Sequence, residues 1–193
     1  MFQVDEILTF WFGTPRDDKA YYDEWHSRWF NANPQFDQEV RDSFIKDYQQ
    51  ASTRQLTAWQ EEPRSGLALV LLLDQFPRNM FRGSPQAFAT DALAREVATH
   101  LIQSGFDRRL LPIERAFVYM PFMHSELLAD QQYSVELFQR LAQERDYLNF
   151  VMYAIKHLEI IERFGRFPHR NVTLGRVSTG EETAFLAQPD SSF

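Results

Sequence analysis

The fold of this chain follows from one apolar stretch, Gly66-Leu67-Ala68-Leu69-Val70-Leu71-Leu72-Leu73, which ends at Asp74. A helix formed by this stretch is apolar on every side, which is typical of a helix that its neighbours surround completely. A membrane span needs about 20 apolar residues, so the stretch is too short to cross a bilayer. We therefore expect a central, buried helix against which the rest of the chain packs.

Helical signals continue on both sides of this stretch. Apolar residues recur at spacings of three and four, as in Phe36, Val40, Phe44 and Tyr48. No segment alternates apolar and polar residues for long enough to indicate a strand. The sequence therefore predicts an all-α protein of about nine helices, at roughly 4–12, 17–30, 34–51, 64–76, 85–104, 112–128, 131–144, 149–164 and 179–187.

Capping residues support these boundaries. Asn33-Pro34 places a capping side chain before a proline at the first helical position. Gly13, Gly105 and Gly165 each follow a helical segment, where a left-handed residue commonly ends a helix. The range Ser178–Glu181 has the spacing of a capping box and predicts the start of the last helix.

The composition is that of an acidic globular protein. The 193 residues are 44 % hydrophobic, which excludes intrinsic disorder. With 20 basic and 27 acidic residues the net charge is −7, which argues against nucleic-acid and anionic-membrane partners because polyanions repel an acidic surface. Cysteine is absent, which excludes disulfides and thiolate chemistry.

No linker rich in proline, glycine or serine divides the chain. We predict a single helical domain over residues 1–187 and a frayed C-terminal tail over 188–193. Short connections favour antiparallel helix pairs. The first residues lack the basic and apolar regions of a secretory signal, so we expect a cytoplasmic protein.

The first of three polar segments is Asp74-Gln75-Phe76-Pro77-Arg78-Asn79-Met80-Phe81-Arg82. Asp74 continues the buried face at the carboxyl end of the central helix, where desolvation and the helix dipole both disfavour a carboxylate. It therefore needs cationic partners, and Arg78 or Arg82 is nearest in sequence. One interpretation is a structural ion pair in this turn; the other is that Asp74 orients an arginine that binds a ligand.

The second segment is Phe117-Val118-Tyr119-Met120-Pro121-Phe122-Met123-His124-Ser125-Glu126. Pro121 lies inside a helical pattern and leaves the carbonyl of Phe117 without its helical partner. His124 falls on the apolar face, where a histidine is commonly a buried structural residue. Glu126 beside it favours the alternative, a functional site.

The third segment runs from Arg163 to Arg176 and is dense in arginine and phenylalanine, with His169 and no acidic residue. It follows a helix in which His157 lies on an apolar stripe, so burial is the default explanation for that histidine. Ordering so many donors in the segment requires acceptors, either protein carboxylates or a bound anion. Both interpretations stay open from the sequence.

Several familiar chemistries are absent from the sequence. There is no glycine-rich phosphate loop, no Gly-x-Ser-x-Gly motif and no histidine spacing typical of a metal site. We therefore predict no metal and no cofactor. The candidate catalytic residues are His124, Glu126 and His169, and the candidate ligand-binding residues are Asp74, Arg78, Asn79, Arg82, Arg163, Arg166, Arg170 and Asn171.

The motifs resemble those of one protein family. Asp74–Asn79, Met120–Glu126 and Arg163–Asn171, together with the opening Ile7–Gly13, are similar to the signature segments of the bacterial domain of unknown function 924. The resemblance spans nearly the whole chain. It implies an αα-superhelix similar to tetratricopeptide proteins, and it implies no activity, substrate or cofactor.

Two functions compete on this evidence. The arginines and histidines of the three segments favour a pocket for a small anionic ligand, with or without catalysis. The alternative is an interaction module that binds a peptide or protein partner, which rests on fold analogy alone. The pocket hypothesis requires the three segments to converge in space.

Overall fold

The computed structural model describes residues 2–15, 19–144, 147–189 and 191. Within these residues the chain is all-α, without strands, as predicted. The helices are α1 (Phe2–Phe12), α2 (Lys19–Phe30), α3 (Pro34–Ser52), α4 (Pro63–Leu73), α5 (Gln75–Met80), α6 (Asp91–Gln103), α7 (Pro112–Met123), α8 (Leu128–Glu144), α9 (Leu148–Phe164) and α10 (Gly180–Leu186). Four short 3₁₀ helices join them: η1 (Thr57–Glu61), η2 (Pro85–Phe88), η3 (Asp107–Arg109) and η4 (Pro168–Arg170).

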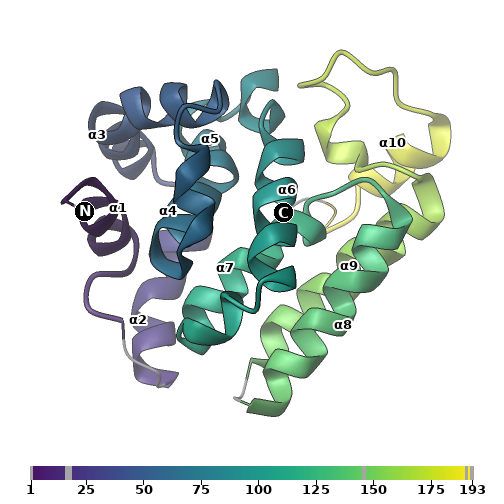
Figure 1. The fold of residues 1–193 in the computed structure, drawn as a ribbon. Coiled ribbons are helices and arrows are strands. Elements are labelled where there is room, and N and C mark those ends of the chain that lie inside the picture. The colour runs from purple at the N-terminus through teal and green to yellow at the C-terminus, as the bar shows by residue number, and fades with distance from the viewer. Residues whose placement is uncertain (1, 16–18, 145–146, 190, 192–193) are drawn as a thin grey trace.

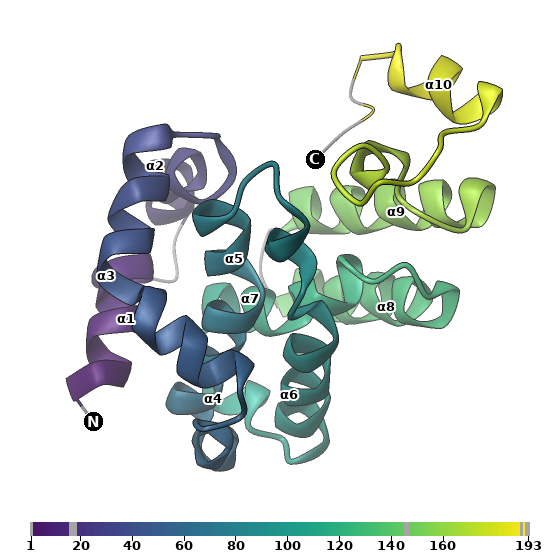
Figure 2. The same cartoon turned by 90° about the horizontal axis from the view of Figure 1, so that it is seen from above.

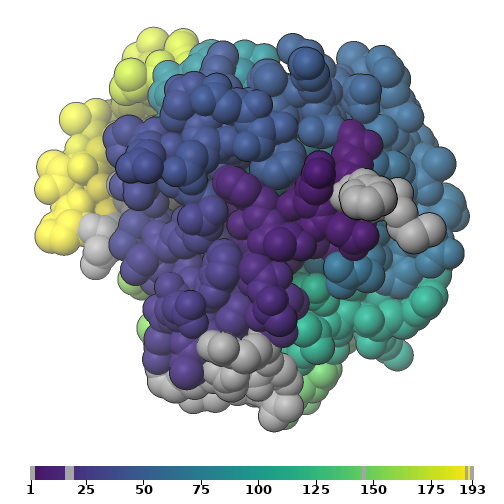
Figure 3. Space-filling view, turned by 90° about the vertical axis from the view of Figure 1, so that its left-hand side faces the viewer, coloured from purple at the N-terminus to yellow at the C-terminus, as the bar shows by residue number. Residues whose placement is uncertain are grey.

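Successive helices lie side by side, so that the chain crosses the molecule from one end to the other (Figures 1 and 2). Helices α1 to α3 form one end and cover one face of the molecule (Figure 3), and α8 to α10 form the other end. Helix α3 packs on α5, α4 on α6, and α7 on α8, which pairs with α9. The finer expectation, a tetratricopeptide-like superhelix, stays a prediction.

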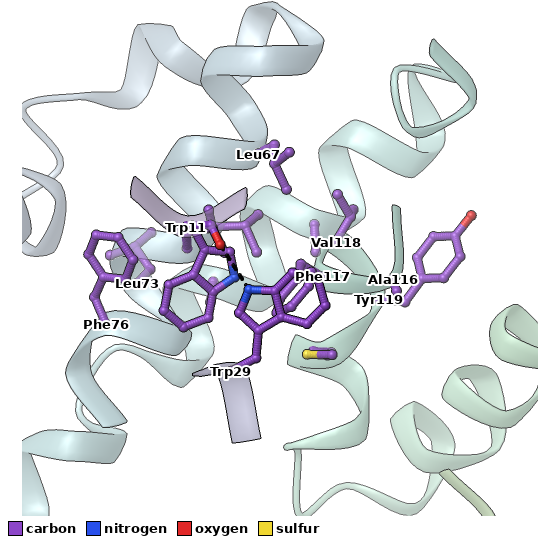
Figure 4. Close-up of a cluster of buried hydrophobic side chains, with 14 of the residues drawn as sticks. Trp11, Trp29, Leu67, Leu73, Phe76, Ala116, Phe117, Val118 and Tyr119 are labelled. Carbon is purple, nitrogen blue, oxygen red and sulfur yellow. Dashed lines mark hydrogen bonds between the residues drawn. The ribbon is translucent and has the colours of Figure 1, made fainter. Parts of the chain in front are cut away.

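Helix α4 is the central helix that its sequence predicts. It contacts α1, α3, α6 and α7, and residues 66–73 are all buried. At its end Trp11, Trp29 and Phe117 join α1, α2 and α7 in one aromatic cluster (Figure 4). The indole Nε1 of Trp29 donates a hydrogen bond of 2.8 Å to the Trp11 carbonyl, which fixes α2 against α1.

The predicted helix 64–76 divides in two at Asp74, where α4 ends and α5 begins. Pro77 lacks the N–H that would bond the Leu73 carbonyl in a continuous helix. That carbonyl instead accepts a hydrogen bond of 2.6 Å from the buried Thr90 hydroxyl. The break places Asp74 at a junction between two helices.

Other helix boundaries also differ from the predicted ones, most of them by a turn or less. The predicted helix 85–104 begins with the 3₁₀ turn η2 before α6 starts at Asp91. The predicted helix 112–128 ends at Met123, because the Gln131 amide bonds the carbonyls of Met123 and Ser125 in place of further helical partners. The last helix is capped by Thr179 rather than by Ser178.

The glycine predictions at the helix ends are confirmed. Gly13, Gly105 and Gly165 have φ values of 59°, 69° and 67°, a region that side chains with a Cβ rarely adopt. Of the predicted tail 188–193, residues 190, 192 and 193 lie outside the described part of the chain. Across the described residues, no helix is both long and apolar enough to cross a membrane.

Candidate functional site

A cavity of about 550 Å³ lies where α2, α5, α7 and α9 meet the loop after α5 and the segment after α9. All three polar segments singled out in the sequence contribute side chains to it. The break at Asp74 brings the start of α5 to its wall, and the end of α7 brings His124. The convergence that the pocket hypothesis requires is therefore present.

The cavity has a cationic side and carries no acidic side chain among its described lining residues. Its basic residues are Arg78, Arg82 and Arg170 on one side and Lys156 from α9. The carboxylate partners of the three arginines, Asp37 and Asp91, are not among the lining residues. Arg78 pairs with Asp91 at 3.0 Å, and Arg170 approaches the same carboxylate at 3.6 Å.

Asp74 lies directly behind this wall and is fully buried. It lies 3.2 Å from the Arg78 guanidinium, 2.8 Å from Nδ1 of His124 and 2.6 Å from the Gln75 amide, which donates to it. Burial would raise the pKa of Asp74, but Arg78 and His124 outweigh burial and lower it to about 2. Asp74 is therefore ionised and orients two residues of the cavity wall.

His124 ends α7 and turns its ring toward the cavity. Burial and the positive charge of Arg78 lower its pKa, although Asp74 opposes them. The imidazole is therefore neutral at pH 7. Because an ionised carboxylate only accepts hydrogen bonds, Nδ1 carries the hydrogen that Asp74 accepts, and the lone pair lies on Nε2.

Two further histidines line the same cavity. The ring of His157 lies 6.4 Å from that of His124, and its Nδ1 lies 2.7 Å from the Tyr153 carbonyl, one turn earlier on α9. Burial lowers the pKa of His157 to about 3 and that of His169 to about 4. Both imidazoles are therefore neutral at pH 7.

Arg170 is the most unusual cation of the site. Its side chain is only 7 % exposed and its guanidinium carbon lies 4.4 Å from the Phe167 ring centre and 4.7 Å from that of Phe88. Its buried Nε has no hydrogen-bond acceptor in the described part of the chain. Burial and the nearby Arg78 lower the pKa of Arg170 to about 10, so it keeps its charge at pH 7.

The cavity lining also has an apolar and aromatic part. Trp29 and Phe30 from α2, Phe150 from α9 and the thioethers of Met120 and Met123 form this wall. Ring contacts join the two helices, with the Phe30 and Phe150 centres 6.2 Å apart. A ligand in the cavity would therefore meet both cationic and aromatic groups.

The structure separates the predicted site residues into two groups. Six of them line the cavity and a seventh, Asp74, lies behind the wall. The six are Arg78, Asn79, Arg82, His124, His169 and Arg170. Asn79 and Arg82 also both bind the Asp37 carboxylate, at 2.8 and 2.7 Å.

The remaining four do not line the cavity. Glu126 accepts a hydrogen bond from the Phe167 amide and pairs with Arg176 at 2.8 Å. Arg163 pairs with Glu181 at 2.8 Å, and Arg166 pairs with Glu182 at 2.6 Å.

The Asn171 amide bonds Ser178 and the same Glu182 carboxylate. These contacts order the segment after α9, which is the structural interpretation that the sequence left open. Through that segment they also hold His169 and Arg170 in the cavity wall.

Sequence reasoning missed several lining residues. His157 was interpreted as a core residue, and Lys156 and Gln75 carried no signal beyond their position. The aromatic residues that α2 contributes to the lining, Trp29 and Phe30, were also missed. A signal was available in α9, where Tyr153, Lys156 and His157 place polar groups within one turn of the helix.

No cluster of histidine, aspartate and glutamate among the described residues is arranged to hold a metal ion. Fold and cavity together define an all-helical protein with a cationic, aromatic-walled cavity. The sequence model of one family, described as "Bacterial protein of unknown function (DUF924)", matches residues 7–190. The chain belongs to this family, as the resemblance of its motifs predicted.

A solved structure supports the assignment. The chain is similar to the protein of unknown function ATU0120 from Agrobacterium tumefaciens, with 40 % sequence identity and a TM-score of 0.85. The match covers 96 % of this chain and 97 % of that one. No curated protein matches the chain.

Proposed function

We propose that the cavity binds a small organic anion that also carries an apolar or aromatic portion. The observation that carries this proposal is the environment of Arg170. Its buried guanidinium approaches a carboxylate only at 3.6 Å, and it shares that carboxylate with Arg78. Because a guanidinium offers five N–H donors, and donors that are buried without acceptors are costly, an anionic ligand would complete this group.

Lys156 supports the same proposal from α9. It forms no ion pair with the described residues, and its ammonium lies 5.9 Å from the centre of the Tyr153 ring. The lining therefore presents cations whose charge the carboxylates behind the wall balance only in part. A carboxylate or phosphate group fits this charge, since both accept hydrogen bonds from guanidinium groups in a paired geometry.

The volume of the cavity and its aromatic lining residues indicate what the rest of the ligand is like. The volume of about 550 Å³ is typical of small-molecule sites, which span roughly 300–1,000 Å³. Trp29, Phe30 and Phe150 offer flat apolar surface in the same cavity. An aryl or branched alkyl carboxylate combines both features, and a peptide-binding module has no comparable observation in its favour.

The test compares charged and neutral ligands of the same shape. Benzoate and phenyl phosphate should raise the melting temperature with concentration, because a ligand that binds only the native state stabilises it. Benzyl alcohol, which has the ring without the charge, should have little effect. If the alcohol stabilises the protein as much as the two anions do, the proposal is wrong.

Variants locate the binding. Arg170→Gln should weaken benzoate binding by about tenfold or more in calorimetry, which corresponds to about 1.4 kcal/mol. Arg140→Gln is the matched control, since Arg140 is 61 % exposed on α8 and, among the described residues, pairs with its neighbour Glu136. Arg170→Lys is a second variant, which keeps the charge and can be measured if the glutamine variant fails to fold. Wild-type affinity in both Arg170 variants would contradict the proposal.

A further inference from the structure

The pair formed by Asp74 and His124 has the geometry of a base that a carboxylate orients. The carboxylate is fully buried, and its two oxygens lie 2.8 and 3.0 Å from Nδ1 of His124. The Gln75 amide and the Arg78 guanidinium fix the carboxylate from two other directions. His124 is therefore held in one orientation and one tautomer, with Nε2 unprotonated.

The unprotonated nitrogen is available to the cavity. The His124 ring lines it, and Nε2 forms no hydrogen bond with any described residue. The groups that face His124 come from several elements: Asp74 and Arg78 at the α4–α5 junction, Asp91 at the start of α6 and His157 on α9. The combined electrostatic effect of these groups, together with burial, keeps the imidazole uncharged and able to accept a proton at neutral pH.

We propose that His124 is a general base that removes a proton from carbon in the molecule bound in this cavity. The proton passes to Nε2, and the electron pair of the broken C–H bond stays on the substrate. Arg78 and Arg170 stabilise the negative charge that develops there. The Asp74 carboxylate stabilises the resulting imidazolium, and Asp74 is thus a positioning residue.

Proton abstraction fits the lining better than covalent catalysis does. No serine lines the cavity in the described part of the chain, and the sequence has no cysteine. Thr173 and Lys156 line the cavity, but neither forms a hydrogen bond with His124 in the described part of the chain, so the pair of nucleophile and histidine that acyl transfer requires is not formed. Removal of a proton requires only the base, the substrate and groups that stabilise the anion, and all the protein groups are in place.

The inference rests on the proposed function for the identity of the natural substrate, but it can be tested with a neutral probe. The probe is 5-nitrobenzisoxazole, whose flat bicyclic ring suits the aromatic wall. When a base removes its ring C–H proton, the electron pair of that bond forms a nitrile and the N–O bond breaks. The oxygen keeps the pair as a coloured cyanonitrophenolate, so no other reactant is needed.

The wild-type protein should accelerate this elimination well above the buffer rate. Its kcat/KM should rise with pH as one group loses its proton below pH 6.5, the ordinary pKa of histidine. At higher pH it should stay constant. Catalysis by Lys156 would instead keep rising toward the pKa of an amine. A rate that does so, or a rate equal to that of buffer, would overturn the proposal.

Variants identify the base. His124→Gln should lower kcat by about 100-fold or more, and imidazole added to His124→Ala should restore part of the rate. His100→Gln is the matched control, because His100 lies on α6 outside the cavity and approaches Glu61 at 3.6 Å. Equal rates in the His124 and His100 variants would also overturn the proposal.

The role of Asp74 has its own readout. Asp74→Asn should lower kcat by about tenfold or more with little change in KM, and it should displace the pH limb, because the carboxylate no longer stabilises the imidazolium. A merely structural role would leave the limb in place. If the variants fail to fold, carbethoxylation of the wild-type protein should inactivate it together with modification of His124, and inactivation with His124 intact would refute the assignment.

The two proposals fail separately. Benzoate binding without elimination refutes the general base and leaves the anion site. If elimination occurs and benzoate does not inhibit it, the result supports His124 as the general base and contradicts the proposed anion site.

Discussion

Replacing Asp74 by asparagine should destabilise the protein in a way that depends on pH. The surroundings of Asp74 lower its pKa from the ordinary 3.8 to about 2. Since each pKa unit corresponds to about 1.36 kcal/mol, the ionised side chain contributes about 2 kcal/mol to the free energy of unfolding at pH 7. The side chain is fully buried, so solvent does not screen this contribution.

The sign of the pH dependence follows from the lowered pKa. The contribution is complete above pH 3.8 and is lost as the pH falls through about 2. Asparagine does not titrate, so the difference between wild type and variant should shrink on acidification. It should be about 2 kcal/mol at pH 7 and smaller by about 1 kcal/mol at pH 3.

Urea unfolding, followed by fluorescence of the buried Trp11 and Trp29, measures both numbers. Asp42→Asn is the control, because Asp42 is exposed on α3 and, within the described part of the chain, accepts a hydrogen bond from Gln38 one turn earlier. This control should change stability by about 0.5 kcal/mol or less. A difference for Asp74→Asn that is below about 1 kcal/mol at pH 7, or that is the same at both pH values, would refute the reasoning.

Three further predictions concern other parts of the molecule. Gly66→Ala should lower the free energy of unfolding by about 1–2 kcal/mol in urea, because the new Cβ would lie 2.4 Å from a methyl of the buried Leu101; a more stable variant would contradict this. Glu182→Gln should lower the melting temperature by several degrees, because the carboxylate holds both an arginine and the first turn of α10, whereas the exposed Glu181→Gln should change it far less. The ring signals of His157 should show no titration between pH 5 and 8 in NMR, because burial lowers its pKa to about 3, and a midpoint near 6.5 would disprove the burial argument.

The candidate site was predictable in part. Asp74 was identified because a carboxylate on a buried helix face needs partners, and Arg78 is its partner as the spacing indicated. Arg163 and Arg166 were chosen by the same kind of reasoning but pair with Glu181 and Glu182 and do not line the cavity. An arginine-rich segment signals that acceptors exist, but it does not say whether they are protein side chains or a ligand.

The all-helical architecture, the buried central helix and the glycines that end helices follow from the sequence, because a period of 3.6 residues and the caps at helix ends are local properties. The cavity depends on contacts between distant segments. His124 lies 50 residues from Asp74, and the aromatic wall joins α2 to α9. With 20 basic and 27 acidic residues, many ion pairings are equally compatible with the charge pattern, so only the packing of the helices selects which cations are paired and which face the cavity.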